Sequence, residues 1–336
     1  MPYTLLQGGR RRRRRGRGVL AAAIAIALLA TLVLAPRAGH EPVQRAVPAP
    51  PGPLLESDVA PLAGGGTAPS PLAVRMEDPR DSVHVRFKHP PRSGLLFDID
   101  TGRVLWRYRP DRVLPIASLT KMMTALVVVD RLRDSDLAKI TKEALSYTGS
   151  GVGVLPRGKS IAVSTLLYGL LLPSGNDAAI ALALRAAGSQ DAFVAQMNRR
   201  AEAMGLVCTR FSSVSGIKDA GNHSCAPDLA ALARAVLREP RLARIVSRRS
   251  AVLPFPIKGR KLYLYNNNPL LRSGYRGTTG VKTGYTDAAG RCLVATARHG
   301  RIRLGVVLLN SPDPGRQAER LLDRGFARSR ALSGRG

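Results

Sequence analysis

The order of strand-like and helix-like segments constrains the fold of this 336-residue chain more than any single motif. Strand-like runs flank Asp100-Thr101-Gly102, whose turn residues predict a β-hairpin. Three more strand-like runs, 280–285, 292–297 and 302–309, lie near the other end of the chain. Helical patterns cover 118–132, 163–172, 176–187, 191–204, 226–237 and 316–327. This order predicts one α+β domain over residues 81–330, with an antiparallel sheet formed from both ends of the domain and packed against a helical subdomain.

The first 80 residues are typical of an export segment followed by a spacer. Seven arginines crowd residues 10–17, and an apolar run broken only by Thr31 follows over 19–35. This layout within residues 1–36 indicates a signal peptide or signal anchor, and a basic nucleic-acid tail before a buried helix is the alternative. The run just reaches bilayer-spanning length, and no small-x-small cleavage site follows it, which favours an anchor. Residues 37–80, rich in Pro, Ala and Gly, predict a linker, so the domain is expected outside the cytoplasm.

The net charge of +29 allows binding to nucleic acid, but its distribution argues against that function. Only nine of the 52 basic residues are lysines, and the arginines are scattered over most of the chain. Aromatic residues make up 4% of the sequence, which is few for the stacking platforms of single-strand binders. A basic surface instead favours anionic lipid or anionic polymers of the cell envelope. We expect no nucleic-acid partner.

The cysteines and histidines offer little catalytic chemistry. Cys208 and Cys225 bracket a loop-like stretch and could form a disulfide worth roughly 3 kcal/mol, while three reduced thiols, Cys292 included, are the alternative. None of the five histidines belongs to a metal-binding pair such as HExxH, so no metal site is predicted. The G-x-S-x-G motif of a Ser-His-Asp enzyme is absent, and His223 is most simply a loop residue. Lysine therefore becomes the candidate base.

The stretch "IASLTKMMTAL" places Ser118 and Lys121 three residues apart at the start of a helical pattern. Side chains at this spacing share a helix face and can meet. Burial and nearby positive charge lower the pKa of a lysine from its usual value of about 10.4, which makes it a usable base. The pattern alone is weak, because the chain carries a second copy, "SGIK" at Ser215 and Lys218, in a glycine-rich loop without a helical run.

Two later motifs distinguish the first copy from the second. "LLPSGNDAAIALAL" places Ser174-Gly175-Asn176 at a turn between two apolar helical runs, where an ordinary helix cap is the simpler interpretation. "GVKTGYT" places Lys282-Thr283-Gly284 on a strand that is followed by two more strands. The three motifs in this order form the set known from penicillin-binding proteins and class A β-lactamases.

With these motifs, the sequence resembles the serine-type D-alanyl-D-alanine carboxypeptidases, which are low-molecular-mass penicillin-binding proteins of peptidase family S11. The resemblance extends from about residue 93 to 326 and includes "FSSVSGIKDAGNHSCAPDLAALA" and "GVKTGYTDAAGRCLVATA". It implies a β-lactamase/transpeptidase-like fold and no cofactor or metal. The implied reaction is removal of the terminal D-alanine from peptidoglycan stem pentapeptides through an acyl-enzyme, with β-lactams as inhibitors.

The resemblance also implies a role for each motif residue. Ser118 is expected to be the nucleophile, Lys121 its base, and Ser174 a relay for the proton that reaches the leaving D-alanine. Implied substrate-binding residues are Asn176, Lys282, Thr283, Gly284, Tyr285 and Arg316. Within this set the backbone N–H groups of Ser118 and Tyr285 are expected to form an oxyanion hole, and Arg316 to lie near the substrate carboxylate.

Several alternatives stay open at this point. A β-lactamase of class A needs a deacylating glutamate soon after the second motif, and only Glu202 and Glu239 occur between Asn176 and Lys282, so slow deacylation from penicillin is expected. An endopeptidase that cuts D-Ala–diaminopimelate crosslinks would share every motif. A membrane-tethered binding protein without activity is the non-enzymatic alternative. The sequence continues only about ten residues past the last expected helix, so membrane attachment is expected through 19–35.

Overall fold

The computed structural model describes residues 70–76, 82–257 and 260–333. The predicted signal or anchor segment and most of the predicted linker lie outside these residues. All elements described below belong to one unit, residues 65–336. In the part of the chain that is described, no helix combines the length and apolarity needed to cross a membrane.

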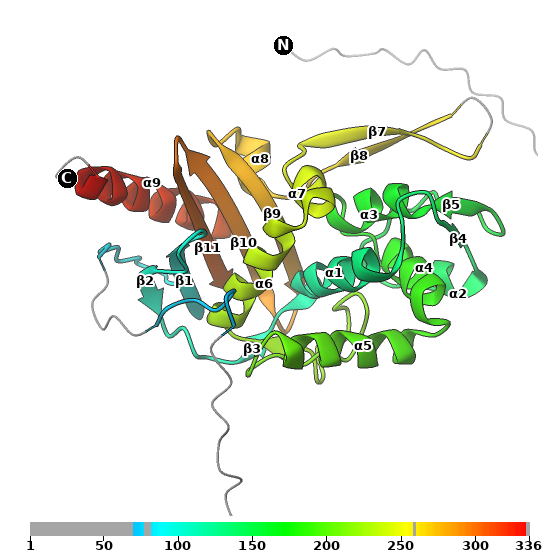
Figure 1. Cartoon of the computed structure of the whole chain (residues 1–336), viewed down its shortest axis with the longest axis horizontal. Helices are drawn as coiled ribbons and strands as arrows, with labels where there is room; N and C mark the ends of the chain where they lie inside the picture. The colour runs from blue at the N-terminus through cyan, green and yellow to red at the C-terminus, as the bar shows by residue number, and fades with distance from the viewer. Residues whose placement is uncertain (1–69, 77–81, 258–259, 334–336) are drawn as a thin grey trace, which may run out of the picture. The chain divides into compact units, whose positions relative to one another are not determined.

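A five-stranded antiparallel sheet forms the centre of this unit (Figure 1). Its strands are β1 (Ser93–Asp98), β2 (Val104–Tyr108), β9 (Thr278–Thr286), β10 (Gly290–His299) and β11 (Ile302–Leu309). They lie in the order β2-β1-β11-β10-β9, so the first strand pairs with the last, with Leu95 opposite Val307. The prediction of a sheet formed from both ends of the domain is confirmed. Strand β9 is an edge strand, which leaves one of its sides open to a functional site.

Helices occupy the chain between β2 and β9, and one follows β11. They are η1 (Ala117–Thr120), α1 (Lys121–Arg131), α2 (Lys142–Leu145), α3 (Val163–Leu171), α4 (Asn176–Ala187), α5 (Gln190–Ala203), α6 (Ala226–Arg238), α7 (Pro240–Val246), α8 (Pro269–Ser273) and α9 (Pro314–Ser333). Three short strand pairs join them: β3 (Leu114–Pro115) with β6 (His223–Ser224), β4 (Leu137–Lys139) with β5 (Ser160–Ala162), and β7 (Ser250–Pro254) with β8 (Lys261–Tyr265).

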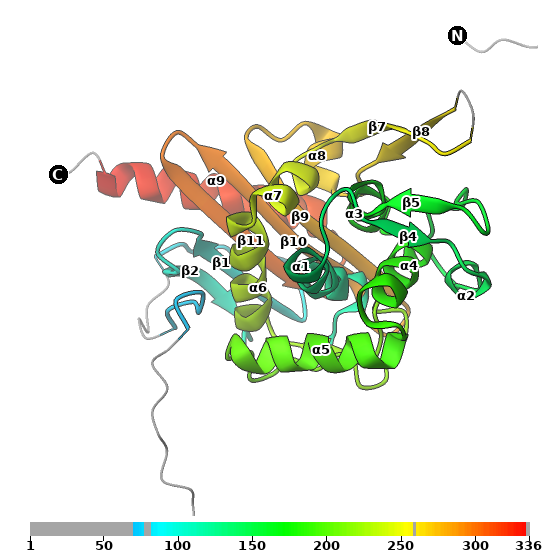
Figure 2. The same cartoon turned by 45° about the vertical axis from the view of Figure 1, so that its right-hand side comes forward.

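Alternation along the strands divides the apolar core into two layers, one on each face of the sheet. Leu95, Val294 and Val307 point towards the helical subdomain, whereas Leu96, Leu293 and Val306 point towards α9. Figure 2 shows α6 and α1 on one side of the sheet and α9 on the other. The first eight residues of α1 are all buried, because this helix is surrounded by α3, α4, α5 and α6. Helix α1 is therefore a rigid central support for the residues at its N-terminus.

Residues 70–76, the end of the predicted linker, pack against the folded domain. Arg234 on α6 is 3% exposed and donates hydrogen bonds to the backbone carbonyls of Leu72 and Ala73 as well as to those of Ile99 and Asp100. A buried guanidinium has to satisfy its donors, and the incoming chain supplies two of the acceptors. This segment is thus part of the folded unit, which a Pro- and Gly-rich composition did not indicate.

Candidate active site

Ser118 lies on a single 3₁₀ turn that leads directly into α1. The residue before it, Ala117, has φ of 47°, a left-handed conformation that costs energy for any residue except glycine. The Thr120 hydroxyl donates to the Ala117 carbonyl (2.8 Å) and so fixes this turn from inside the helix. Strain held in this way at the start of a buried helix places the Ser118 side chain reproducibly.

Lys121, the first residue of α1, is completely buried, and its amine lies at the centre of three contacts. Its Nζ is 2.9 Å from Ser118 Oγ, 2.6 Å from Asn176 Oδ1 and 2.7 Å from the backbone carbonyl of Ser215. Burial lowers the pKa of Lys121 well below its usual value, the positive charge of Lys282 lowers it further, and Asp177 partly opposes the shift. A neutral amine next to a serine hydroxyl can act as a base.

The Ser174-Gly175-Asn176 motif forms the turn between α3 and α4, as predicted. Ser174 also has a left-handed backbone (φ 69°), and its hydroxyl is buried without a hydrogen-bond partner in the described part of the chain. A buried, unpaired hydroxyl marks a position where a substrate or water molecule is expected to bind. Asn176 begins α4, and its amide spans the site, because Oδ1 accepts from Lys121 while Nδ2 donates to the Thr148 carbonyl (2.6 Å).

The Lys282-Thr283-Gly284 motif lies on the edge strand β9 and faces the Ser118 turn. Lys282 is 2% exposed, and burial lowers its pKa to about 7. A Cβ at Gly284 would lie 2.9 Å from the Ile116 carbonyl and 3.1 Å from the Ser118 backbone nitrogen, so only glycine allows this approach. Tyr285 follows with a 63% exposed side chain, whose hydroxyl donates to Asp287 (3.0 Å).

The second Ser-x-x-Lys copy belongs to the same site, although sequence reasoning set it aside. Its Ser215 carbonyl accepts from Lys121, and Gly216, with φ of 78°, packs directly on Ala117. Further along this loop, buried Asn222 donates to the Thr120 hydroxyl (2.9 Å), and Asp219 accepts from Thr286 at the end of β9 (2.8 Å). No pattern in the sequence indicated these contacts, because each joins residues far apart in the chain.

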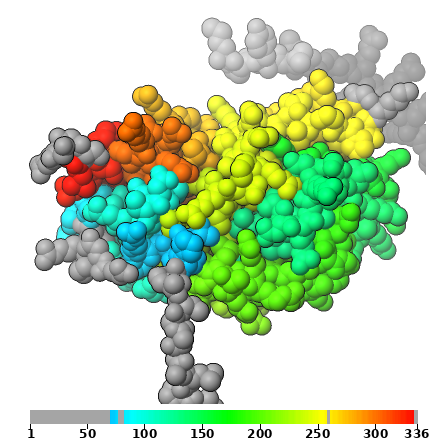
Figure 3. Space-filling model, viewed as in Figure 1, coloured from blue at the N-terminus to red at the C-terminus, as the bar shows by residue number. Residues whose placement is uncertain are grey.

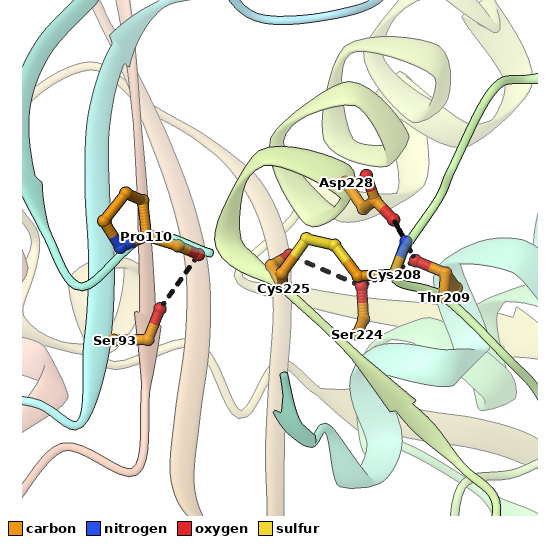
Figure 4. Close-up of a disulfide and its surroundings, with 7 residues drawn as sticks. All are labelled: Ser93, Pro110, Cys208, Thr209, Ser224, Cys225 and Asp228. Carbon is orange, nitrogen blue, oxygen red and sulfur yellow. Dashed lines mark hydrogen bonds between the residues drawn. A yellow bond between two sulfur atoms is a disulfide. The ribbon is translucent and has the colours of Figure 1, made fainter. Parts of the chain in front are cut away.

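A disulfide between Cys208 and Cys225 closes this loop at both ends (Figure 4). Asp228 on α6 accepts from the Cys208 backbone N–H (2.9 Å) and from the Thr209 hydroxyl (2.7 Å). Burial raises the pKa of the Asp228 carboxyl, and these two hydrogen bonds oppose that shift. The side chains of Cys208, Cys225 and Asp228 also bring potential metal-ligand atoms close together, but the two sulfur atoms are bonded to each other. The disulfide instead holds the loop at the N-terminus of α6.

Asp177 is a further buried residue that the sequence analysis missed. Its carboxylate accepts from the backbone N–H groups of Val152 and Gly153 (2.9 and 3.0 Å). These contacts hold the segment that supplies the Thr148 carbonyl to Asn176. Asp177 directly follows the Ser-Gly-Asn motif, so its position was available as a signal, but its partners were not.

Three other residues singled out from the sequence lie apart from this cluster. Arg316, near the start of α9, has an 89% exposed side chain and pairs with Asp313, and no described contact links it to the cluster. Glu202 is on α5, and Glu239 accepts from the backbone of Arg241 at the start of α7. The role of Arg316 near the substrate carboxylate therefore stays a prediction. Among the described contacts, neither Glu202 nor Glu239 touches Ser118.

A groove of about 240 Å³ opens beside Asn176 and Ser215, with Tyr147 and Ile217 among its lining residues. A larger hollow of about 670 Å³ lies between α1, α4 and α5 and touches none of the motif residues. The smaller groove is the relevant one for chemistry, because it borders the Lys121 cluster.

Comparisons with known proteins agree with this architecture. The family profile for D-alanyl-D-alanine carboxypeptidases, peptidase S11, matches residues 81–313. The D-alanyl-D-alanine carboxypeptidase DacF of Bacillus subtilis is 33% identical over 247 residues, which cover 71% of this chain and 63% of the relative. A D-alanyl-D-alanine endopeptidase of Pseudomonas aeruginosa is 35% identical over 222 residues, covering 65% of this chain and 71% of that protein. The chain thus spans less than two thirds of the length of the Bacillus relative.

The crystal structure of the Streptomyces K15 DD-transpeptidase superposes with a TM-score of 0.68 at 30% identity, covering 73% of this chain and all of that one. The fold is therefore the one shared by penicillin-binding DD-peptidases, as the sequence predicted. The chain belongs to the peptidase S11 family of D-alanyl-D-alanine carboxypeptidases.

Proposed function

We propose that this chain is a serine DD-peptidase that removes the terminal D-alanine from peptidoglycan stem pentapeptides. The observation that carries this proposal is the buried Lys121 amine, in contact with Ser118 Oγ and two carbonyl oxygens. Carbonyl oxygens only accept hydrogen bonds, so Asn176 and Ser215 together occupy both N–H bonds of a neutral amine. The nitrogen lone pair then faces the Ser118 hydroxyl, which is the arrangement that a general base requires.

In the acylation step, Ser118 Oγ attacks the carbonyl carbon of the penultimate D-alanine, and its proton moves to Lys121 Nζ. The developing oxyanion accepts from the backbone N–H groups of Ser118 and Tyr285. Losing one such donor costs about 3 kcal/mol of transition-state stabilisation. The closeness of Gly284 to the Ser118 nitrogen supports this assignment, since it brings the two backbones together.

Collapse of the tetrahedral intermediate breaks the peptide bond, and the leaving D-alanine nitrogen takes a proton through Ser174. The buried, unpaired Ser174 hydroxyl is available for this relay, and cationic Lys282 supports it electrostatically. Thr283 hydrogen-bonds the substrate carboxylate, and Asn176 holds the substrate amide. Water then hydrolyses the Ser118 ester, with Lys121 again accepting the proton. Arg316 stays our proposed second partner for the carboxylate.

We propose that β-lactams inhibit the enzyme by acylating Ser118 and that the acyl-enzyme is hydrolysed slowly. Rapid deacylation in class A β-lactamases depends on a glutamate-activated water. Glu239 caps α7 and Glu202 lies on α5, and neither contacts the Lys121 cluster. Neither glutamate is therefore in a position to activate the water that would hydrolyse the acyl-enzyme.

The second candidate reaction is cleavage of D-Ala–diaminopimelate crosslinks. The 35% identity to the Pseudomonas D-alanyl-D-alanine endopeptidase supports this candidate, but no more strongly than the carboxypeptidase relatives support the first. Both reactions would use the same residues on an extracytoplasmic substrate. We propose that the chain works outside the cytoplasm, held to the membrane through 19–35 or secreted after signal cleavage.

The deciding experiment offers the full chain a soluble diacetyl-Lys-D-Ala-D-Ala peptide and, separately, purified crosslinked muropeptide dimers. Release of free D-alanine from the first substrate, without loss of dimers, is the result expected for a carboxypeptidase. Conversion of dimers to monomers at a higher rate would favour the endopeptidase. Failure to process either substrate, in a preparation that melts cooperatively, would contradict the proposed function.

A further inference from the structure

The segment from α7 through β9 has an extreme charge distribution. Residues 240–286 contain ten lysines and arginines and not one aspartate or glutamate. Within the described part of this segment, most of these cations are exposed, whereas Lys282 is buried and Arg241 is half-buried and paired with Asp134. An excess of positive charge of this kind attracts anionic polymers.

The β7–β8 hairpin in this segment has one face packed and one face free. Val252 lies opposite Tyr263 in the antiparallel register, and Ser250 lies opposite Tyr265. Leu262 and Leu264 are buried, whereas Tyr263 and Tyr265 are 59% and 67% exposed. Strand geometry places these two rings on one face at a spacing of about 6.8 Å. Figure 1 shows the hairpin extending from α7 past α3, and it forms part of the yellow surface in Figure 3.

A pocket of about 490 Å³ lies at the base of the hairpin, beside the second tyrosine. It is lined by Arg249, Tyr265, Asn266, Asn267 and Arg272. Two guanidinium groups and two amides, with no carboxylate among these residues, suit a ligand with carboxylate or phosphate groups. The Arg249 guanidinium donates to the Arg272 carbonyl (3.4 Å), so both arginines belong to the same pocket wall.

This pocket is connected to the catalytic motifs through two of the three asparagines that follow β8. Asn267 donates to the carbonyls of Leu172 and Pro173 (both 3.1 Å), directly before Ser174. Asn268 donates to the Gly280 carbonyl (2.9 Å), two residues before Lys282 on β9. A polymer that lies along the hairpin and enters the pocket would therefore pass beside the active site.

We propose that the outer face of the β7–β8 hairpin and the pocket at its base bind the anionic glycan-peptide polymer from which the stem peptides extend. This inference rests on the proposed function, since that polymer would carry the substrate. Pyranose rings have apolar C–H faces that stack on exposed aromatic rings, and the hydroxyl of an exposed tyrosine can form a hydrogen bond with a sugar hydroxyl. The arginines bind carboxylates of the peptide stems.

A lipid surface is the competing partner for a basic, tyrosine-bearing hairpin. Two features of the hairpin favour the polymer. The pocket is concave and lined by amides and guanidinium groups, and among the described residues of β7 and β8 Val252 is the only large aliphatic side chain exposed with the two tyrosines. Peripheral insertion into a bilayer relies on larger apolar residues such as Leu, Phe and Trp.

The test measures co-sedimentation of the full chain with purified, insoluble peptidoglycan at several salt concentrations. One pair of variants removes the surface: Tyr263→Ser with Tyr265→Ser, and Arg249→Gln with Arg272→Gln. Matched controls are Tyr263→Phe with Tyr265→Phe, which keeps both rings, and Arg324→Gln with Arg328→Gln, which removes two exposed charges from α9. Melting temperatures establish that all variants are folded.

We expect about tenfold weaker binding for both surface variants and binding within twofold of the wild type for both controls. Wild-type-like binding by the surface variants would overturn the inference. So would an equal loss in the two arginine variants, which would indicate net charge alone. Loss of binding to phosphatidylglycerol vesicles without loss of binding to peptidoglycan would assign the surface to lipid and contradict the proposal. Because wild-type D-alanine release from the soluble peptide is measured separately, failure of the proposed function stays distinguishable from failure of this inference.

Discussion

The two Ser-x-x-Lys stretches of this chain have the same spacing but differ in backbone conformation and in whether serine and lysine meet. Ser118 and Lys121 lie on a helical turn, so their side chains share a face and Nζ reaches Oγ at 2.9 Å. Ser215 and Lys218 lie on a loop with a left-handed Gly216 between them, and Ser215 is buried while Lys218 is exposed. Spacing alone therefore defines a catalytic pair only where the backbone is helical.

The second stretch nonetheless completes the first. Its Ser215 carbonyl is one of the two oxygens that accept from the Lys121 amine. Because a backbone carbonyl makes this contact, the identity of the Ser215 side chain matters little, and the path of the loop matters greatly. The roles of the two stretches can be separated by making the same change in each of them.

Removing each serine is expected to give the largest difference. Ser118→Ala deletes the nucleophile, so D-alanine release should fall by about 10⁴-fold or more and labelling by fluorescent penicillin should disappear. Ser215→Ala keeps the backbone carbonyl and should retain labelling and activity within about threefold. A gel of both variants beside the wild type makes the measurement. Labelling of Ser118→Ala at the wild-type level would refute the assignment of the nucleophile.

Removing each lysine comes next. Lys121→Ala removes the base and leaves two buried carbonyl oxygens without a donor, so acylation should slow by 10²- to 10⁴-fold. Lys218→Ala removes an exposed side chain, so its acylation rate should stay near that of the wild type and its stability should change by no more than about 0.5 kcal/mol. Stopped-flow acylation with a chromogenic cephalosporin measures both rates. Comparable losses in the two variants would mean that Lys121 is not the base.

The pH dependence separates the two buried lysines of the site. Low pH protonates Lys121 and abolishes its role as a base, while high pH removes the charge of Lys282, whose pKa is about 7. kcat/KM should therefore follow a bell-shaped curve with an alkaline limb near pH 7, and should fall about tenfold between pH 7 and 8.5. Lys218→Gln should leave this curve unchanged, and Lys282→Gln should remove the alkaline limb.

Unfolding of the protein would not account for the fall of kcat/KM at alkaline pH. The pKa of Lys282 is lowered in the folded state, so between about pH 7 and the usual value of 10.5 the unfolded chain binds more protons at this residue. Its contribution to stability therefore rises with pH across this window. A melting temperature that fell between pH 7 and 8.5 in parallel with activity would contradict the assignment of the limb to Lys282.

Local patterns predicted most of the fold, because helices and sheet strands have strong periodicity. The helix predicted over 176–187 and the strand predicted over 302–309 have the bounds found for α4 and β11. The sequence did not predict the β7–β8 hairpin, because Pro254 and Pro256 interrupt its alternating pattern and proline argues against a strand. Residues 70–76 were assigned to a linker, because the buried Arg234 that holds them lies far along the chain.

In the candidate site, too, the motif residues were predicted and the long-range supporting contacts were not. Motifs brought Ser118, Lys121, Ser174, Asn176 and Lys282 into one hypothesis. Hydrogen bonds join Lys121 to Ser118 and Asn176, and Ser174 and Lys282 are both buried. Supporting contacts such as Asn222 to Thr120 join residues 102 positions apart, so no local pattern could reveal them. The role of Arg316 stays a prediction, because its exposed side chain contacts only Asp313 among the described residues.

The smallest expected effect comes from loosening the second stretch without changing its residues. The Cys208–Cys225 disulfide closes the loop that supplies the Ser215 carbonyl, and loop entropy assigns it roughly 3 kcal/mol. Reduction with dithiothreitol should lower the melting temperature and slow D-alanine release several-fold, since the Lys121 amine would keep its burial but lose a fixed acceptor. The double variant Cys208→Ser with Cys225→Ser should reproduce both changes.

That double variant is also the control for the reductant. It retains the buried thiol Cys292, so dithiothreitol should have no further effect on it. If the reduced wild type, with its three free thiols verified by titration, kept its full rate, the loop would be positioned by other contacts. The Asp219–Thr286 and Asn222–Thr120 hydrogen bonds would then be sufficient to hold the Ser215 carbonyl against Lys121, and the disulfide would act on stability alone.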